Sequence, residues 1–347
     1  MSALPVSPGS NDSFASAGAV VRVAGDDGRV AVEIVLGFPA DSSQERYRTA
    51  VAEVVQRHGA ELARFELRSR ITAHAVQPNL SPLQKVRNII AVGSGKGGVG
   101  KSTTAVNLAL ALAADGARVG VLDADVYGPS VPMMLGLSGR PDSPDGKSIE
   151  PMRAHGLQAM SIGLLVEQDT PMIWRGPMAT SALTQLLNDT RWDDLDYLLI
   201  DLPPGTGDIQ LTLAQKIPVA GAVIVTTPQD VATLDAKKAL KMFEKVEVPV
   251  LGLIENMAVH VCSNCGHAEH VFGEGGGQRM SNQYGVPLLG SLPLELAIRE
   301  QGDAGVPVVV AAPESEAALA YLDAARQLAI RLALRPRVTP SISASLL

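Results

Sequence analysis

From about residue 88 onward, short runs of consecutive apolar residues alternate with longer segments in which apolar residues recur every three or four positions. The continuous runs predict strands that are buried on both faces, and the periodic segments predict helices. Strands are expected at 88–93, 118–122, 157–162, 197–200, 222–226 and 250–254, and helices at 102–115, 178–188, 230–243, 278–284 and 314–334. This alternation predicts an α/β fold with a mostly parallel sheet flanked by helices over residues 88–334.

The pattern before residue 76 predicts a separate, smaller α+β unit. Two strand-like runs are separated by the turn Gly25-Asp26-Asp27-Gly28, and a helical stripe and a third strand-like run follow. The strands are expected at 20–23, 30–36 and 62–72, and the helix at 43–58. We therefore expect a β-β-α-β accessory domain at 18–75 and a proline-containing linker at 76–87. Residues 1–17 and 335–347 are rich in small and polar residues and are expected to be disordered.

Composition narrows the class of protein. A chain of 347 residues with 46% hydrophobic and 19% charged residues has enough apolar surface for a large core and about two domains. The net charge of −7 argues against non-specific nucleic-acid binding. The chain begins without a signal-peptide pattern, and no apolar run approaches the ~18 residues of a membrane span. We expect a cytoplasmic protein without nucleic-acid or membrane partners.

The segment Gly95 to Ser102 fits the G-x-x-x-x-G-K-[ST] phosphate loop and lies between a predicted strand and a predicted helix. Glycines allow backbone N–H groups to surround the phosphates of ATP, and the start of the helix favours the same anions. Lys101 is expected to contact the β- and γ-phosphates, and the Ser102 hydroxyl to ligate Mg²⁺. The expected nucleotide-binding residues here are Gly95, Lys96, Gly97, Gly98, Val99, Gly100, Lys101, Ser102 and Thr103.

Acidic residues follow two of the predicted strands, at the edge where such sheets bind ligands. Asp125 is expected to position or polarise the attacking water, and Asp123 to hold the loop or a water on Mg²⁺. Asp201 is the expected magnesium partner at the end of another strand. Gly205 can offer its N–H to the γ-phosphate, which makes 203–208 a candidate nucleotide-sensing switch.

Two later segments suit the nucleotide base. Asn256 follows the predicted strand at 250–254, and an asparagine amide can hydrogen-bond the edge of adenine. Residues 291–294 follow another short apolar run and are candidates to flank the ring.

Cys262 and Cys265 form a C-x-x-C pair in a glycine-rich segment, and the chain contains no other cysteine. This spacing places two thiolates on one metal centre, but it also occurs in redox pairs and as half of a zinc site. His267 and His270 are the candidates to complete a zinc site within one chain. Ligation by four thiolates requires two copies of the chain.

The string G-K-G-G-V-G-K-S-T resembles the deviant phosphate loop of the MinD, ParA, ArsA and nitrogenase-reductase ATPases. In that group the early lysine, here Lys96, reaches across a dimer interface to the nucleotide of the partner subunit. The resemblance therefore implies a catalytic role for Lys96 beside Lys101 and Asp125, within a homodimer.

A closer resemblance, from about residue 86 to residue 313, is to the Mrp/ApbC/Nbp-type iron–sulfur cluster carrier ATPases. It is carried by the phosphate loop, D-A-D-V-Y-G-P-S, W-R-G-P-M at 174–178, D-L-P-P-G-T-G-D, E-N-M and C-x-x-C-G-H. This family resemblance implies a [4Fe–4S] cluster bridged by Cys262 and Cys265 of two subunits. It also implies ATP-dependent transfer of that cluster from a scaffold or donor protein to apoproteins.

The unit at 18–75 resembles the Fe–S assembly domain that often precedes such ATPases. It departs from the pattern at Gly37-Phe38-Pro39-Ala40-Asp41-Ser42, where relatives carry a cysteine in a T-P-A-C-P turn. We therefore expect a scaffold or docking role for this unit.

Three other classes of protein remain open from the sequence. A MinD- or ParA-like positioning ATPase would use a basic or membrane-binding C-terminal helix, and Arg326, Arg331 and Arg335 lie in that region. We expect this Ala-rich helix to pack on the sheet instead. A redox partner of the nitrogenase-reductase kind has its ligand cysteines far apart in sequence. A zinc metallochaperone would use the same cysteine pair.

Overall fold

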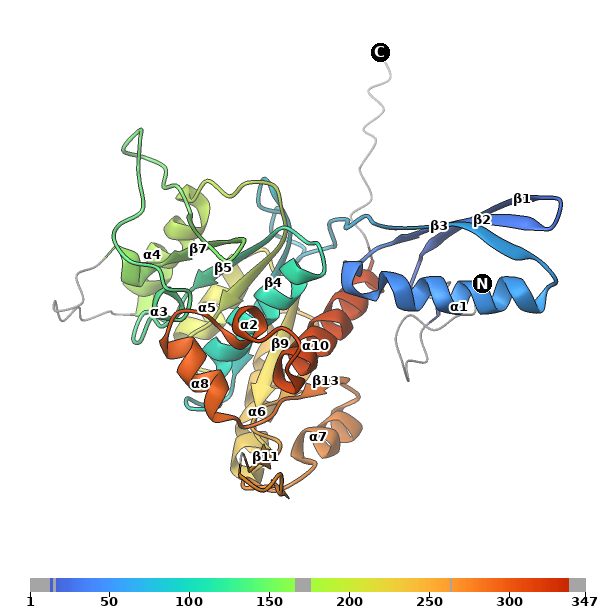
Figure 1. Ribbon diagram of the computed structural model, residues 1–347. Coiled ribbons are helices and arrows are strands. Elements are labelled where there is room, and N and C mark those ends of the chain that lie inside the picture. The colour runs from blue at the N-terminus through green and yellow to red at the C-terminus, as the bar shows by residue number, and fades with distance from the viewer. Residues whose placement is uncertain (1–12, 15–16, 166–175, 263, 337–347) are drawn as a thin grey trace, which may run out of the picture.

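The computed structural model describes residues 13–14, 17–165, 176–262 and 264–336 (Figure 1). The larger unit is built on an eight-stranded sheet in the order β13-β10-β9-β4-β8-β5-β7-β6. Its strands are β4 (Val86–Ser94), β5 (Val119–Asp123), β6 (Met152–Ala154), β7 (Leu157–Ser161), β8 (Leu195–Asp201), β9 (Gly221–Thr226), β10 (Val250–Glu255) and β13 (Leu288–Ser291). Neighbouring strands are parallel except β6 and β7. The predicted mostly parallel α/β fold is confirmed.

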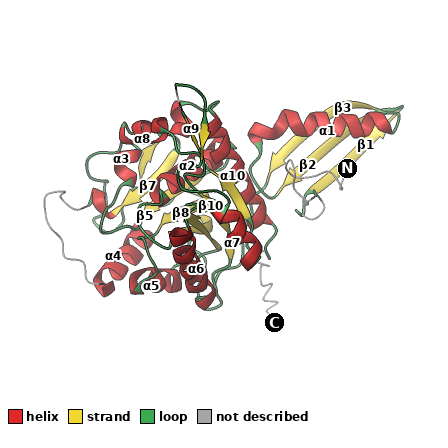
Figure 2. Ribbon diagram, turned by 90° about the horizontal axis from the view of Figure 1, so that it is seen from below, coloured by secondary structure: helices red, strands yellow, loops and turns green. Residues whose placement is uncertain are grey.

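Helices cover both faces of this sheet (Figure 2). They are α2 (Lys101–Ala114), α3 (Val131–Met134), α4 (Gly176–Asp189), α5 (Asp208–Lys216), α6 (Asp230–Lys245), α7 (Gly276–Tyr284), α8 (Leu296–Asp303), α9 (Val308–Ala311) and α10 (Glu316–Ala333). Successive strand residues point to opposite faces. Ile90 therefore packs in the core that contains α2 and α10, and Ile89 packs in the core that contains α4 to α6. Because both faces are covered, the strands are continuously apolar.

Two features of the helices bear on the predictions. The C-terminal helix α10 is confirmed as a packed helix, since Leu328, Ile330 and Leu332 are buried. Helix α5 was not predicted. Its apolar residues Ile209, Leu211 and Leu213 alternate with a period of two, and its buried face includes the polar Gln210. None of the described helices is long and apolar enough to cross a membrane.

The small unit is a three-stranded sheet covered by one helix, as predicted. It contains β1 (Val20–Asp26), β2 (Arg29–Leu36), the short 3-10 turn η1 (Asp41–Ser43), α1 (Gln44–Arg57) and β3 (Glu61–Ser69). Strands β1 and β2 are antiparallel, and β2 and β3 are parallel. Phe14 is fully buried, with its ring 5.3 Å from that of Tyr47. The burial of Phe14 therefore contradicts the expectation of disorder at this residue of the segment 1–17.

The small unit contacts the larger one through a polar junction between η1, the end of α2 and α10. Ser42 donates its backbone N–H to Asp115 Oδ1 at 3.1 Å, and Arg326 donates to Ser42 Oγ at 2.9 Å. Arg326 and Asp115 are both buried and form an ion pair at 3.4 Å. Residue Ser42, at the end of the segment 37–42, thus makes a contact with α10. The docking role expected for this unit stays a prediction.

Both ends of the larger unit are also tied down. Gln77, in the predicted linker, is buried and donates to the carbonyl of Ala214 at 2.7 Å, while its carbonyl accepts from Val219 N–H at 3.0 Å. Ala75 N–H donates to the carbonyl of Pro336 at 3.2 Å. Residues 337–347 of the predicted tail lie outside the described part of the chain.

Replacing Arg326 with methionine is expected to destabilise the fold by about 3–5 kcal/mol, because Asp115 would remain as a buried, unpaired charge. Arg299 provides the matched control, since its ion pair with Asp303 on α8 is exposed. Arg299→Met is expected to cost at most about 1 kcal/mol. Urea unfolding of the full chain measures both losses. Equal losses of unfolding free energy in the two variants would show that the junction does not stabilise the fold more than an exposed ion pair does.

Candidate functional site

The carboxyl ends of β4, β5, β8 and β10 meet at one edge of the sheet, as expected for parallel strands of an α/β fold. A cavity of about 810 Å³ opens there, which is within the usual size of small-molecule sites. Its walls include the phosphate loop, Asp125, Asn256, the segment around Leu294 and helix α8. Most of the predicted nucleotide-site residues are therefore brought to one cavity.

The phosphate loop runs from the end of β4 to the start of α2 and is shaped by close packing at two glycines. A Cβ atom on Gly95 would lie 2.1 Å from the backbone carbonyl of Asp235 in α6. Gly100 has the left-handed φ of 78°, and a Cβ there would lie 2.2 Å from Asn256 Nδ2. Only glycine fits at these positions, which explains the motif in physical terms.

Lys101 lies at the centre of the charged part of the cavity. Its Nζ is 2.6 Å from Asp201 Oδ1, 3.2 Å from Ser102 Oγ and 4.0 Å from Asp125 Oδ2. Burial raises the pKa of Asp201, and the ammonium of Lys101 opposes this shift. Asp201 Oδ2 is buried and has no hydrogen-bond partner among the described residues. A hydroxyl and a carboxylate with an unused oxygen fit the hard oxygen ligands that Mg²⁺ prefers.

Asp123 is a loop-holding residue in this structure. Its Oδ1 accepts from Asp125 N–H at 3.1 Å, and its Oδ2 accepts from Val131 N–H at 3.1 Å and from Ser161 Oγ at 3.2 Å. Burial, and then the nearby charge of Asp201, raises the pKa of Asp123 to about 7. Of the two roles expected for Asp123, the geometry supports holding the loop, because both oxygens already have donors.

Asp125 and Gly205 lie on the two loops that approach the phosphate loop. Asp125 lines the cavity, and its Oδ1 accepts from Tyr127 N–H at 3.3 Å. Gly205 donates its N–H to the carbonyl of Ser94 at 3.1 Å. A contact between this N–H and a γ-phosphate, as expected from the sequence, requires the bond to Ser94 to break. Gln210 of α5 holds the same loop by donating to the Pro204 carbonyl.

Lys96 lines the cavity with a half-buried side chain. Its backbone carbonyl accepts from Ser94 Oγ at 2.9 Å. Within the described part of the chain, its ammonium makes no hydrogen bond or ion pair that meets ordinary distance criteria. This differs from Lys101, whose ammonium pairs with Asp201 of the same chain.

The Asn256 side chain points to the phosphate loop. Its Nδ2 donates to the Val99 carbonyl at 2.9 Å, and its backbone N–H donates to the Thr226 carbonyl at 2.7 Å. The sequence predicted that this amide contacts adenine. In this structure the side-chain amide holds the phosphate loop through one N–H. Pro293 and Leu294 of the predicted base segment line the same cavity as Asn256.

Helix α8 contributes cavity residues that the sequence analysis missed. Leu296, Ile298 and Arg299 line the cavity. The only signal was an eight-residue segment after Pro293, which is too short for a periodic pattern to be distinctive. Trp174 and Arg175 of the W-R-G-P-M string lie outside the described residues, and Gly176 begins α4.

The cysteine pair lies at the turn of a small hairpin formed by β11 (His260–Val261) and β12 (Ala268–Glu269), which we call the cysteine hairpin. Cys262 is partly exposed and Cys265 is exposed. The backbone N–H groups of Asn264 and Cys265, and then the Cys265 thiol, lower the pKa of Cys262. A lowered thiol pKa favours the thiolate, which is the form that binds metals.

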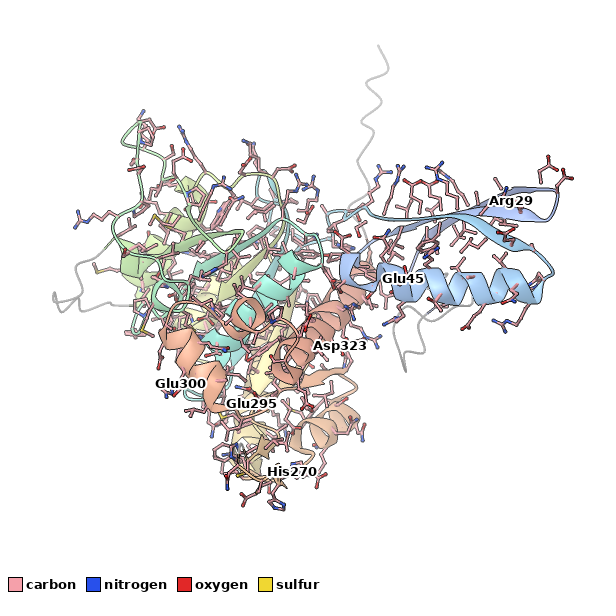
Figure 3. All side chains as sticks on the ribbon, viewed as in Figure 1. Arg29, Glu45, His270, Glu295, Glu300 and Asp323 are labelled. Atoms are coloured by element: carbon pink, nitrogen blue, oxygen red, sulfur yellow. The ribbon has the colours of Figure 1, made fainter. Side chains whose placement is uncertain are left out.

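Neither predicted histidine partner has a ring contact with a thiol among the interactions that the described residues make, although the His267 carbonyl accepts from Cys262 N–H at 2.9 Å. His270 uses Nδ1 to bond the Ala258 carbonyl at 2.8 Å, and His267 is exposed. Over residues 13–14, 17–165, 176–262 and 264–336, no group of three or more His, Cys, Asp or Glu side chains is placed to hold a metal ion. In Figure 3, His270 marks the end of the molecule that carries the cysteine hairpin, with Glu295 in the same region.

Comparison with known proteins decides between the classes left open above. Residues 85–329 match a ParA-type family model described as NUBPL iron-transfer P-loop NTPase. The chain is also 60% identical over 269 residues to an iron–sulfur cluster carrier protein of Pseudomonas fragi, covering 77% of this chain and 94% of that one. The chain belongs to the iron–sulfur cluster carrier family of P-loop NTPases.

Other relatives extend this assignment. The iron–sulfur cluster carrier protein of Escherichia coli strain K12 is 53% identical over 324 residues, covering 93% of this chain and 88% of that one. This carrier-family match therefore includes most of the small N-terminal unit. The mouse iron–sulfur cluster transfer protein NUBPL is 51% identical over 261 residues, covering 75% of this chain and 82% of that one.

Solved structures agree with the carrier-family fold. A nucleotide-binding protein from Archaeoglobus fulgidus, solved in complex with ADP, is 40% identical with a TM-score of 0.57, covering 64% of this chain and 87% of that one. The cell-division ATPase MinD of Pyrococcus furiosus has a TM-score of 0.52 at 24% identity, covering 70% of this chain and 98% of that one. This second likeness concerns the fold alone.

Proposed function

We propose that this chain binds an iron–sulfur cluster and delivers it to apoproteins, using ATP bound and hydrolysed in the cavity at the phosphate loop. The observation that carries this proposal is the position of the cysteine hairpin. It begins at His260, and His260 itself lines the cavity that contains Lys101. The hairpin that carries the thiol pair therefore starts at the wall of the candidate nucleotide cavity, within a chain of the cluster carrier family.

The residues of the cavity suit binding and hydrolysis of ATP. Lys101 and the N–H groups at the start of α2 would hold the phosphates, and Ser102 with Asp201 would hold Mg²⁺. Bound Mg²⁺ supplies positive charge that offsets the negative charge developing on the phosphate oxygens. Asp125 lies beside Lys101 and is placed to orient the attacking water. Asp123 keeps the Asp125 loop in position.

The cysteine pair suits a shared cluster. A [4Fe–4S] cluster takes four thiolates, and each chain has two. We propose a two-fold homodimer in which each subunit provides Cys262 and Cys265. A cluster held between two exposed hairpins is accessible to a donor scaffold and to an apoprotein client. We place this exchange in the cytoplasm, where thiols stay reduced.

Metal analysis of the full chain, purified without oxygen, tests the proposal. We expect iron near two atoms per chain, equal sulfide, and a dimer by light scattering. Zinc at one atom per chain without iron would favour a zinc metallochaperone with His267 or His270 as further ligands. A monomer with a full cluster would contradict the shared site. Nucleotide-dependent assembly with no metal would favour a positioning ATPase.

Lys96 is expected to act on the nucleotide of the other subunit of the dimer. Its ammonium makes no ion pair or hydrogen bond with the described residues of its own chain. Lys96→Ala should keep ADP affinity within about threefold while hydrolysis falls about a hundredfold. Asp125→Asn is also expected to lose hydrolysis. Phosphate release and calorimetric titration measure the two effects.

A mixture of these two variants separates action within a subunit from action across the interface. In a mixed dimer, the site of the Lys96→Ala chain has its own Asp125 and receives Lys96 from the other chain. Random exchange of subunits would then restore about a quarter of the wild-type rate. No recovery after exchange would contradict action across the interface.

A further inference from the structure

We propose that residues 256–260, which we call the strap, transmit nucleotide occupancy of the cavity to the cysteine hairpin, with Asn256 and His260 as its positioning residues. The inference rests on the proposed function of the two sites, because it concerns how one affects the other. It is argued from contacts at both ends of the strap.

The first end of the strap is fixed to the phosphate loop. Asn256 is buried, and its Nδ2 donates to the Val99 carbonyl at 2.9 Å across 157 residues of sequence. The same nitrogen fills the space that a side chain on Gly100 would need. A shift of the Val99 carbonyl when phosphates bind therefore has to move the Asn256 amide or break its hydrogen bond.

The second end of the strap is fixed to another segment of the cavity wall, residues 292–294. His260 Nδ1 lies 2.9 Å from the Leu294 carbonyl, and because a carbonyl only accepts, Nδ1 carries the proton. Two backbone hydrogen bonds join the same two segments. Ala258 N–H donates to the Leu292 carbonyl, and Leu294 N–H donates to the Val259 carbonyl. His260 and Leu294 both line the cavity. A bound nucleotide that displaces Leu294 therefore acts directly on His260.

The cysteine hairpin has its base on the strap. His260 is the first residue of β11, and a single residue separates it from Cys262. On the returning side, His270 follows β12 and bonds the Ala258 carbonyl of the strap at 2.8 Å. Both strands of the hairpin are thus attached to the segment that contacts the nucleotide cavity. Figure 3 shows His270 at the same end of the molecule as Glu295, which lines the cavity.

Met257 holds an unfavourable backbone conformation in the middle of the strap. It has a φ of 57°, a left-handed conformation that non-glycine residues adopt at a cost of about 1–2 kcal/mol. It lies between the Asn256 contact and the His260 contact, and its side chain lines the cavity. Such a conformation persists only while neighbouring contacts hold it. We expect loss of either side-chain contact to weaken the hold on Met257 and to let the hairpin shift, although the backbone bonds of Asn256 and Ala258 remain.

Thiol alkylation of the full-length apoprotein tests the coupling without any cluster. Rates at Cys262 and Cys265 are measured with and without ADP and a non-hydrolysable ATP analogue, at concentrations that saturate each variant in its own titration. In wild type, we expect nucleotide to change the rates on the order of fivefold. No cluster is involved in this test. If the protein bound no iron but nucleotide still changed the alkylation rates, the proposed function would be overturned and the coupling would not.

Two matched pairs of variants identify the positioning residues. Asn256→Asp keeps the size of the side chain but cannot donate to Val99, and Asn282→Asp makes the same change on the exposed face of α7. His260→Ala removes the bond to Leu294, whereas His260→Asn keeps an N–H donor near the position of Nδ1. We expect the nucleotide response to be lost in Asn256→Asp and His260→Ala and kept in the other two.

Three results would overturn the inference. The first is a wild-type protein whose thiol reactivity does not respond to nucleotide. The second is an unchanged response in Asn256→Asp or His260→Ala at saturation. The third is equal loss in His260→Ala and His260→Asn, which would indicate a general disturbance of packing. If Asn256→Asp does not fold or bind nucleotide, the two His260 variants alone decide the question.

Discussion

Replacing Lys101 with methionine is expected to abolish nucleotide binding, with affinity for ADP falling by at least about a hundredfold. The Lys101 ammonium lies 2.6 Å from Asp201 and 4.0 Å from Asp125. Without it, the phosphates would enter a buried site that contains two carboxylates and no cation from the protein at its centre. Methionine keeps most of the apolar stem, so the effect measures the loss of charge. Calorimetric titration of the full chain with ADP provides the measurement.

Two further variants separate binding from folding. Lys101→Met leaves Asp201 buried without its partner, so the free energy of unfolding should also fall. Lys101→Met/Asp201→Asn removes that unpaired charge and should recover stability without recovering ADP affinity. Lys241→Met, at an exposed ion pair with Glu244 on α6, should change neither quantity. Wild-type affinity in Lys101→Met would place the nucleotide outside this cavity.

The larger sheet could be predicted from the sequence because its cause is local. A strand covered on both faces needs apolar residues at consecutive positions, and Ile89 and Ile90 point into different cores for this reason. The phosphate loop was equally predictable, because its glycines, Lys101 and Ser102 are consecutive in the chain and serve one ligand. Helix α5 shows where this logic fails. Its buried Gln210 donates to the Pro204 carbonyl, and the spacing of apolar residues cannot predict a contact made by a polar side chain.

Contacts between distant segments explain the differences at the site. Asn256 was predicted to contact the base because asparagine after a strand is suited to that role. In the structure one N–H of its amide donates to the Val99 carbonyl, a contact set by the neighbouring places of β10, β9 and β4 in the sheet, and contact with the base stays a prediction. Asp123 was given two roles, and the three donors on its oxygens come from residues 2, 8 and 38 positions away. Such choices follow from the assembled sheet and cannot be read from spacing.

The junction of the two units gives the same lesson in another form. The sequence contains no cysteine at residues 37–42, but it did not indicate what those residues contact. In the structure, Ser42 and Asp41 contact Asp115 at the end of α2, whose first residue is Lys101. One helix therefore connects the phosphate loop to the small unit. A local sequence pattern could not predict this connection, because it joins residues that are far apart in the chain.

Replacing either cysteine with serine is expected to remove essentially all cluster iron. A shared [4Fe–4S] cluster would lose two of its four thiolates at once, because the change occurs in both subunits of the dimer. A serine hydroxyl is a poor substitute for the soft thiolate that iron–sulfur clusters require. ADP affinity in Cys262→Ser should stay within about threefold, since the thiols are not among the residues that line the cavity. His267→Ala is the control, and it should keep the iron.

Mixed dimers provide the sharper measurement, because they distinguish a shared cluster from a separate metal site in each chain. A dimer of one wild-type chain and one Cys262→Ser chain has three thiolates at a shared site. If the cluster is shared, this dimer should hold far less than half of the wild-type iron, because every cluster is affected. If each chain holds its own metal, the wild-type chain keeps its full share and the dimer retains half. Iron per dimer after tandem-tag purification without oxygen therefore decides between the two arrangements, and retention of half would refute the bridge between subunits.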